Sequence, residues 1–430
     1  MASQGKDARK VGLFLATMLV ASSMIGSGIF LLPATLAQFG SMTTLGWLIA
    51  TAGALVVARV LAELGREAPA AGGACAYVAR ALGPQWGFHA TAAYWLACWT
   101  GNVAIAIAAI GYLAHFYPEL ARALPLAAAA VALIWLLTLA NVLGPRRVCQ
   151  IESATFFVGV IPIIVVIVGG AWAFHGTTFY AAWNVSGEAA WRSLPPALVL
   201  MFWAFAGVES ASIATALVKN PERNVARATY YGVLIAAGVY LLGCGVIMGL
   251  LPAGALARST APFADAARLL LGSAAAAVLA AAVAILALIK IVGTLAGWIL
   301  LTAETGEAGA AHHLFPQVFA RRGWNLVIAG VLMSAGVAAT VSPTLGEQFG
   351  KLIAVSVVLM LLLYIYACLA LWRVAKRERG WALAGILFCA GVIALSGADM
   401  LLWSAIVLVC VFPLYYCRGP RARAAGSELV

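Results

Sequence analysis

The chain has 430 residues, of which 64% are hydrophobic and only 10% are charged, and its mean hydropathy is +1.01. This composition excludes a water-soluble domain and predicts an integral membrane protein, since a bilayer is crossed by runs of about 20 apolar residues. The formal net charge of +11 does not indicate nucleic acid, because the basic residues stand in short flanks beside apolar segments, where they act as topology signals.

About twelve apolar segments of spanning length follow one another along the chain, and we treat residues 1–430 as one domain. The expected ranges are 11–38, 44–64, 86–115, 124–143, 152–174, 196–217, 228–250, 274–303, 325–342, 352–372, 381–398 and 400–416. Most of the 26 Lys and Arg residues fall at segment ends on the side of the N-terminus. The positive-inside rule therefore predicts that both termini are cytoplasmic and that the number of crossings is even.

The first segment is interrupted near its middle by Gly26-Ser27-Gly28. Backbone groups released from helical pairing inside a bilayer are tolerated only where they line a cavity or contact a ligand. Broken helices at mid-membrane hold the substrate in many secondary transporters. We therefore expect a binding site here, the alternative being a close contact between helices made by small residues.

The sixth segment mirrors the first, because Gly207 and Glu209 interrupt its apolar run five segments later. Five is odd, so the two halves would have opposite orientations in the membrane, as in inverted-repeat transporters. The predicted fold is an all-α membrane protein with a 5+5 inverted-repeat (LeuT-like) core, broken first and sixth helices and two peripheral helices. We place the first repeat at 11–174, the second at 196–372 and the peripheral helices at 381–416.

Several motifs together resemble the amino acid–polyamine–organocation superfamily, and within it the basic amino acid/polyamine antiporters. They are the residues 24–30, Gly72-Gly73, 94–102, 181–187, 207–210 and Ala261-Pro262-Phe263. The resemblance runs from about Val11 to the end of the twelfth segment. It implies a multi-pass protein of the bacterial inner membrane that exchanges a cationic amino acid for its decarboxylated amine by alternating access, with arginine and agmatine as the favoured pair. It implies no enzyme activity and no cofactor.

The resemblance also implies which residues contact substrate. Ser27 and Gly28 would hold the amino-acid end, and Trp203 would stack on the cationic end, where a desolvated cation over an indole gains about 1–2 kcal/mol. The full expected set is Ser23, Ser27, Gly28, Ala97, Cys98, Asn102, Ile105, Trp203, Ala206, Trp298 and Ser356. Gating is implied for Trp298 and for an outer gate of Tyr94, Glu209 and Tyr364.

Three positions depart from the arginine/agmatine antiporters. Ser23, Ile105 and Ala206 stand where those proteins have asparagine, methionine and isoleucine. The pocket surface is therefore altered, and histidine, ornithine, lysine or a diamine are alternative substrates.

Two charged residues are expected inside segments, and an isolated charge there costs at least about 2.5 kcal/mol by insertion scales. Glu209 could carry a proton or make a structural hydrogen bond to a neighbouring helix. Lys290, in the eighth segment, could carry a proton or act as a built-in cation, since relatives that do not use sodium place a lysine at the vacated sodium site. Alternatively, Lys290 snorkels or pairs with Glu209.

Other functions remain open at this point. The nearest alternative is a proton-coupled or facilitative permease for neutral or varied amino acids. A channel would need a polar path or a ring of charges, whereas these segments offer isolated polar residues; a membrane scaffold is the remaining class. The expected partners are amino acid and amine substrates and the lipid bilayer, without nucleic acid; a homodimer stays open. The eight cysteines lack paired metal-type spacing, so we expect no metal site.

Overall fold

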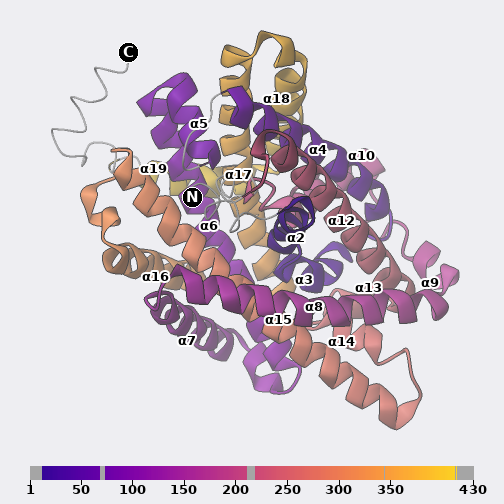
Figure 1. Ribbon diagram of the computed structural model, residues 1–430. Helices are drawn as coiled ribbons and strands as arrows, with labels where there is room; N and C mark the ends of the chain where they lie inside the picture. The colour runs from indigo at the N-terminus through magenta and orange to yellow at the C-terminus, as the bar shows by residue number, and fades with distance from the viewer. Residues whose placement is uncertain (1–11, 68–72, 211–217, 343, 412, 414–430) are drawn as a thin grey trace.

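The computed structural model describes residues 12–67, 73–210, 218–342, 344–411 and 413, and these residues form helices without a strand among them (Figure 1). The helices are α2 (Leu13–Met24), α3 (Ser27–Leu36), α4 (Thr43–Glu67), α5 (Gly73–Leu82), α6 (Pro84–Ala114), η1 (Pro118–Ala121), α7 (Ala123–Asn141), α8 (Pro145–Trp172), α9 (Gly176–Ala181), α10 (Ala190–Phe202), η2 (Trp203–Phe205), α12 (Pro221–Leu250), α13 (Ala253–Leu256), α14 (Pro262–Ala267), α15 (Ser273–Ala311), η4 (Gln317–Ala320), α16 (Arg322–Ala339), α17 (Leu345–Val374), η5 (Lys376–Glu378), α18 (Arg379–Ala394) and α19 (Ala398–Val411).

The all-α membrane fold is confirmed, with fewer described spans than the twelve segments expected. Eight described helices are long and apolar enough to cross a bilayer, or ten if each of two bent pairs is one span. The second half of the sixth segment, 211–217, lies outside the described residues, as do Val11, Gly72 and the last residues of the twelfth segment. The helices α18 and α19 have 16 and 14 residues and meet at 107°, so each is shorter than the about 20 residues of a full span.

Both expected helix breaks are present. The helices α2 and α3 form one span bent by 42°, and a Cβ added to Gly26 would lie 2.8 Å from Thr294 Cγ2, so only glycine allows this close approach. In the sixth span, α10 gives way to η2, and Gly207 follows with a φ of +105°. This left-handed backbone favours glycine because it has no Cβ.

Three long helices begin at a proline that follows a residue with positive φ. Proline suits the first helical position, since its missing N–H would have no helical partner there and its φ is already helical. These starts are Gly83-Pro84 for α6, Gly144-Pro145 for α8 and Asn220-Pro221 for α12. By the order of the spans, all three lie on the same side as the start of α2.

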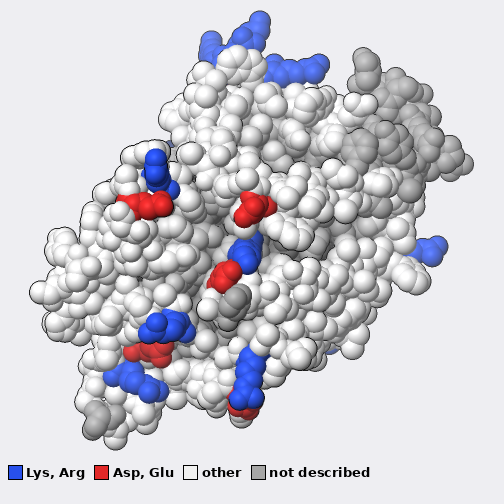
Figure 2. Space-filling view, turned by 180° about the vertical axis from the view of Figure 1, so that it is seen from behind, with Lys and Arg blue, Asp and Glu red and all other residues white. Residues whose placement is uncertain are grey.

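The interior of the bundle is formed by α6 and α17, which pack on each other and on α3, and α15 packs on α6 and α8. Figure 1 shows α8 and α15 lying across the front of the bundle. In the 18-residue apolar stretch of α6, 94% of the residues are buried inside the protein, against 22% in the corresponding stretch of α7. The face in Figure 2 is largely uncharged, with acidic and basic side chains gathered in a few groups, several beside a hollow. The exposed apolar surface is therefore where lipid contacts the protein.

Candidate functional site

A small cavity lies between the two helix breaks. The N-terminus of α3 faces it, and the first amides of a helix have no partners within the helix and carry a partial positive charge. Such a terminus binds carboxylates and other anions. The cavity holds about 10 Å³, room for about one water molecule. Its lining is Ser23, Met24, Gly26, Ser27, Gly28, Ile105, Trp203, Ala206, Thr294 and Trp298.

The carbonyl released at the first break is satisfied by a tyrosine that the sequence did not point to. The Tyr240 hydroxyl donates a hydrogen bond of 3.0 Å to the Met24 carbonyl. A Cβ on Gly28 would lie 2.6 Å from the same hydroxyl, and the Tyr240 ring stacks on Trp47 at 5.2 Å. The same carbonyl accepts a hydrogen bond of 3.1 Å from the Gly26 N–H, so Tyr240 adds a second bond that stabilises the broken conformation.

Two tryptophan rings close the cavity. Trp203 and Trp298 lie 5.7 Å apart between centroids with an interplanar angle of 34°, and both are at most 5% exposed. Added Cβ atoms on Gly28 and Gly101 would lie 3.1 Å and 2.7 Å from opposite parts of the Trp203 ring. The ring is therefore held between α3 and α6, and the cavity of about 10 Å³ is too small for an amino acid in this conformation.

The two breaks are tied to each other by Ser23. Its hydroxyl lies 2.8 Å from the Val20 carbonyl, 3.2 Å from the Gly207 carbonyl and 3.0 Å from the Ser210 hydroxyl. A Cβ on Gly207 would lie 2.9 Å from Ser23 Oγ. A serine at this position therefore couples the first span to the sixth as well as lining the cavity.

Four of the expected substrate contacts do not line the cavity; they are Ala97, Cys98, Asn102 and Ser356. Asn102 Nδ2 donates to Thr302 Oγ1 at 2.9 Å, and Thr302 in turn donates to the Trp298 carbonyl at 2.9 Å. The buried Oδ1 of Asn102 has no hydrogen-bond partner among the described residues.

Two of the other three residues lie beside the Trp203 ring. Ser356 Oγ on α17 donates to the Ala97 carbonyl on α6 at 2.7 Å and lies close to Gly101, which contacts the Trp203 ring. Cys98 is fully buried in α6, near Tyr94 and Glu209. In this conformation none of the three is part of the cavity lining.

The three residues expected in a gate meet in one hydrogen-bonded group. The hydroxyls of Tyr94 and Tyr364 donate to the two carboxylate oxygens of Glu209, at 2.7 Å and 2.8 Å. Glu209 is 1% exposed, so these bonds satisfy a carboxylate that water does not reach. The group joins α6, the sixth span and α17.

This group lies on the side of the N-terminus, whereas the resemblance implied an outer gate. The sixth span starts on the far side of the membrane and reaches Gly207 before Glu209, so Glu209 belongs to its second half. Glu209 also lines a cavity together with α5, the short helix that follows α4 on the N-terminal side. With the predicted topology, the gate faces the cytoplasm.

That second cavity opens beside the Glu209 group and has a largely apolar lining. It holds about 210 Å³, and its lining is Ala74, Cys75, Ala76, Thr91, Tyr94, Glu209, Leu301, Glu304, Thr305, Ala308, Gly309, His312, Leu314 and Leu363. Two carboxylates therefore face it, Glu209 at the gate and Glu304 on α15. We name it the vestibule. The sequence analysis missed Glu304 because the eighth segment was expected to end at residue 303, whereas α15 continues to Ala311.

Lys290 is buried without a hydrogen-bond partner among the described residues. It does not pair with Glu209, and at 1% exposure it does not snorkel to a surface. The charge that faces it belongs to Glu152 on α8. The sequence analysis missed Glu152 because the fifth segment was expected to begin there, whereas α8 begins at Pro145.

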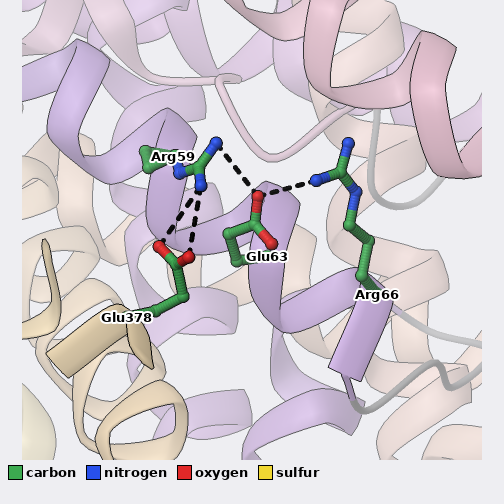
Figure 3. A network of polar contacts seen from close by, with 4 residues as sticks. All are labelled: Arg59, Glu63, Arg66 and Glu378. Carbon is green, nitrogen blue, oxygen red and sulfur yellow. Dashed lines mark hydrogen bonds and ion pairs between the residues drawn. The ribbon is translucent and has the colours of Figure 1, made fainter. Parts of the chain in front are cut away.

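A charged network lies at the end of α4 (Figure 3). Arg59 Nη2 contacts both carboxylate oxygens of Glu378 at 3.3 Å, and Arg59 Nη1 contacts Glu63 at 3.1 Å. Arg66 contacts the same oxygen of Glu63 at 2.8 Å. The network joins α4 to η5, the connection between α17 and α18.

In the described part of the chain, no group of three or more His, Cys, Asp or Glu side chains could hold a metal ion.

The comparisons with known proteins agree with this architecture. The family model described as amino acid permease matches residues 11–423. The cadaverine/lysine antiporter of Escherichia coli K12 is 35% identical over 98% of this chain and 97% of its own length. The putrescine transporter PotE of the same strain is 31% identical over 97% of this chain and 98% of its length. Among solved structures, the Eremococcus coleocola manganese transporter, in complex with an aromatic bis-isothiourea substituted compound, has a TM-score of 0.61 at 15% identity, covering 96% of this chain and 94% of that one.

Proposed function

The chain belongs to the amino acid permease family of the amino acid–polyamine–organocation superfamily, and we propose that it exchanges a cationic amino acid for its decarboxylated amine across a bacterial inner membrane. The observation that carries this proposal is the cavity between the breaks. It offers the N-terminus of α3 to a carboxylate and the faces of Trp203 and Trp298 to a cation. An amino acid uses both ends of this site, whereas its amine uses only the aromatic end.

The substrate pair is lysine and cadaverine in this proposal. The 35% identical relative is a cadaverine/lysine antiporter and the 31% identical relative is a putrescine transporter, which favours an alkyl amine over agmatine. Arginine and agmatine, the pair expected from the sequence motifs, become the competing assignment. The two pairs differ in the head group, because a guanidinium is planar and stacks over its whole face whereas an ammonium is a point charge.

The gates act in series in this mechanism. The tryptophan pair closes the substrate cavity, and the Glu209 group separates that cavity from the vestibule. The carboxylates of Glu209 and Glu304 give the vestibule a negative field that draws diamines from the cytoplasm. The same proposal places both termini in the cytoplasm. It also assigns residues 11–174 and 196–372 to two inverted repeats.

Counterflow in proteoliposomes tests the proposal. Vesicles are loaded with lysine, cadaverine, arginine, agmatine or leucine, or left empty, and uptake of labelled lysine, arginine or leucine is followed in parallel. We expect uptake into vesicles loaded with lysine or cadaverine, little into those loaded with arginine or agmatine, and none into empty ones. Preferred exchange of arginine for agmatine would reassign the substrate pair. Uptake of a neutral amino acid into empty vesicles would instead establish the permease alternative.

A further inference from the structure

The helices α8 and α15 pack against each other through glycines and polar side chains. They run antiparallel, and each contact sets a glycine on one helix against a longer side chain on the other. A Cβ on Gly159 would overlap the stem of Lys290, one on Gly293 would overlap Thr155, and one on Gly297 would overlap the carboxylate of Glu152. Small residues allow helix backbones to approach closely in a membrane. Here the space they leave is filled by the aliphatic stem of Lys290, by Thr155 and by the Glu152 carboxylate.

Lys290 is the unusual member of this contact. Its side chain is 1% exposed, and its Nζ has no hydrogen-bond partner within the described ranges. The Nζ lies 5.3 Å from the centroid of the Phe156 ring, a position in which an aromatic face partly stabilises a cation. A ring does not replace the hydrogen bonds of an ammonium, so the amine gains a proton only where a negative charge compensates it.

Glu152 supplies that negative charge. Among the described residues, the carboxylate whose charge acts on Lys290 is that of Glu152. Glu152 belongs to α8, which packs against α15. The two side chains do not form an ion pair within 4.0 Å in this conformation, because the Glu152 carboxylate lies against Gly297, two turns further along α15. A displacement of α15 along α8 would therefore change the separation of the two groups.

The same stretch of α15 reaches the substrate cavity. The Thr294 hydroxyl donates to the Lys290 carbonyl at 3.0 Å, and Thr294 lies against Gly26 at the first break. Gly297, which holds the Glu152 carboxylate, directly precedes Trp298. Any movement of α15 on α8 is thus carried into the cavity lining at Thr294 and Trp298.

We propose that Lys290, with Glu152 as its counter-charge, is a proton-binding site that couples the conformation of α15 to pH. Binding one proton converts the Lys290 amine to an ammonium. The attraction of this ammonium to Glu152 favours the position of α15 on α8 in which the two groups lie closer together. Loss of the proton removes the attraction and favours the position in which they lie further apart. A proton that stabilises one arrangement more than the other shifts the population between them. The effect on transport rests on the proposed exchange function, whereas the proton site itself does not.

The test compares pH profiles of wild type, Lys290→Met, Lys290→Arg and Glu152→Gln, with Lys351→Met as the matched control. Lys351 is 46% exposed in its side chain and pairs with Glu347 away from this contact. Lysine–cadaverine counterflow is measured from about pH 5.5 to about pH 9, a range in which buried lysines titrate. We expect the wild-type rate to vary about fivefold or more, the lower end of usual coupling between sites. The Lys290→Met profile should be flat, and that of Lys351→Met should match wild type.

Glu152→Gln removes the counter-charge and disfavours the ammonium, so the midpoint of its profile should move to lower pH. Lys290→Arg keeps a permanent charge and should be flat like Lys290→Met. Thermal unfolding of each variant over the same pH range gives a second readout that needs no substrate. If wild type exchanges neither lysine nor cadaverine, the proposed function fails while the unfolding profiles still test the proton site. Profiles of Glu152→Gln and either Lys290 variant that superimpose on wild type in both measurements would overturn the inference.

Discussion

Trp203→Leu is the most direct test of the substrate cavity, because it removes the aromatic face and keeps an apolar side chain. The ring is 4% exposed and lies between Gly28, Gly101 and Trp298, so a cation placed against it would be fully desolvated. A desolvated cation–π contact contributes about 1–2 kcal/mol, and a tenfold change in Kd corresponds to about 1.4 kcal/mol. We therefore expect lysine and cadaverine to bind about five- to thirtyfold more weakly.

The assay is ligand-induced thermal stabilisation followed by counterflow in proteoliposomes. A ligand that binds the folded form raises its stability according to RT ln(1 + [L]/Kd), so the concentration dependence gives Kd. Trp203→Phe retains an aromatic face and should lose less affinity, and Trp324→Leu, at a 57% exposed position on α16, is the control for loss of an indole elsewhere. The reasoning is refuted if a folded Trp203→Leu protein binds both cations as tightly as wild type. It is also refuted if Leu and Phe at this position weaken binding equally.

Three further changes probe the packing around the cavity, the gate and the charged network. Gly101→Ala places a Cβ 2.7 Å from the Trp203 ring and should slow counterflow with little loss of thermal stability. Gly238→Ala, with open space around it, is the control and should leave the counterflow rate unchanged. Equal rates for both variants would contradict the packing argument. Glu209→Gln keeps the size of the side chain but removes its charge, so the bonds from Tyr94 and Tyr364 weaken. We expect slower cadaverine counterflow, and an unchanged rate would make Glu209 structural. Glu378→Gln breaks the two contacts to Arg59 and should lower the free energy of unfolding by at most about 1 kcal/mol, since the pair is partly exposed. Glu347→Gln, in a more exposed pair with Lys351, is its control in a denaturant or thermal titration, and a larger loss for the control would contradict a role of this network in joining α4 to η5.

Much of the fold and of the cavity could be predicted from sequence because a bilayer imposes strict rules on the backbone. A glycine-rich interruption in an apolar run has few interpretations in hydrocarbon, so Gly26-Ser27-Gly28 and Gly207 indicated both breaks. Charge near segment ends indicated topology, and the family resemblance supplied the side chains around Trp203 and Trp298.

The residues that sequence reasoning missed share a physical cause. Tyr240 satisfies the carbonyl at the first break from a helix 216 positions away in sequence, and no local pattern indicates such a long-range contact. Glu152 and Glu304 stand at expected segment ends, where a carboxylate is ordinarily exposed to water and carries no signal. Their importance depends on how far α8 and α15 extend and on what faces them, which only packing determines. The direction of the sixth span places Glu209 after the break, on the side of the N-terminus, so the side of the gate depends on the predicted topology.

One helix connects all of these features. On α15, Thr294 and Trp298 line the substrate cavity, and Leu301, Thr305 and Ala308 line the vestibule. Their spacing of three and four residues keeps them on one stripe of the helix. Lys290, Gly293 and Gly297 follow the same spacing on the neighbouring stripe, which faces α8. The wall of the substrate cavity and the face that packs on α8 are thus adjacent faces of one continuous helix. A displacement of α15 relative to α8 must therefore change the cavity lining at Thr294 and Trp298 and the separation of Lys290 from Glu152 together. The altered pH profiles expected for the Lys290 variants follow from this coupling.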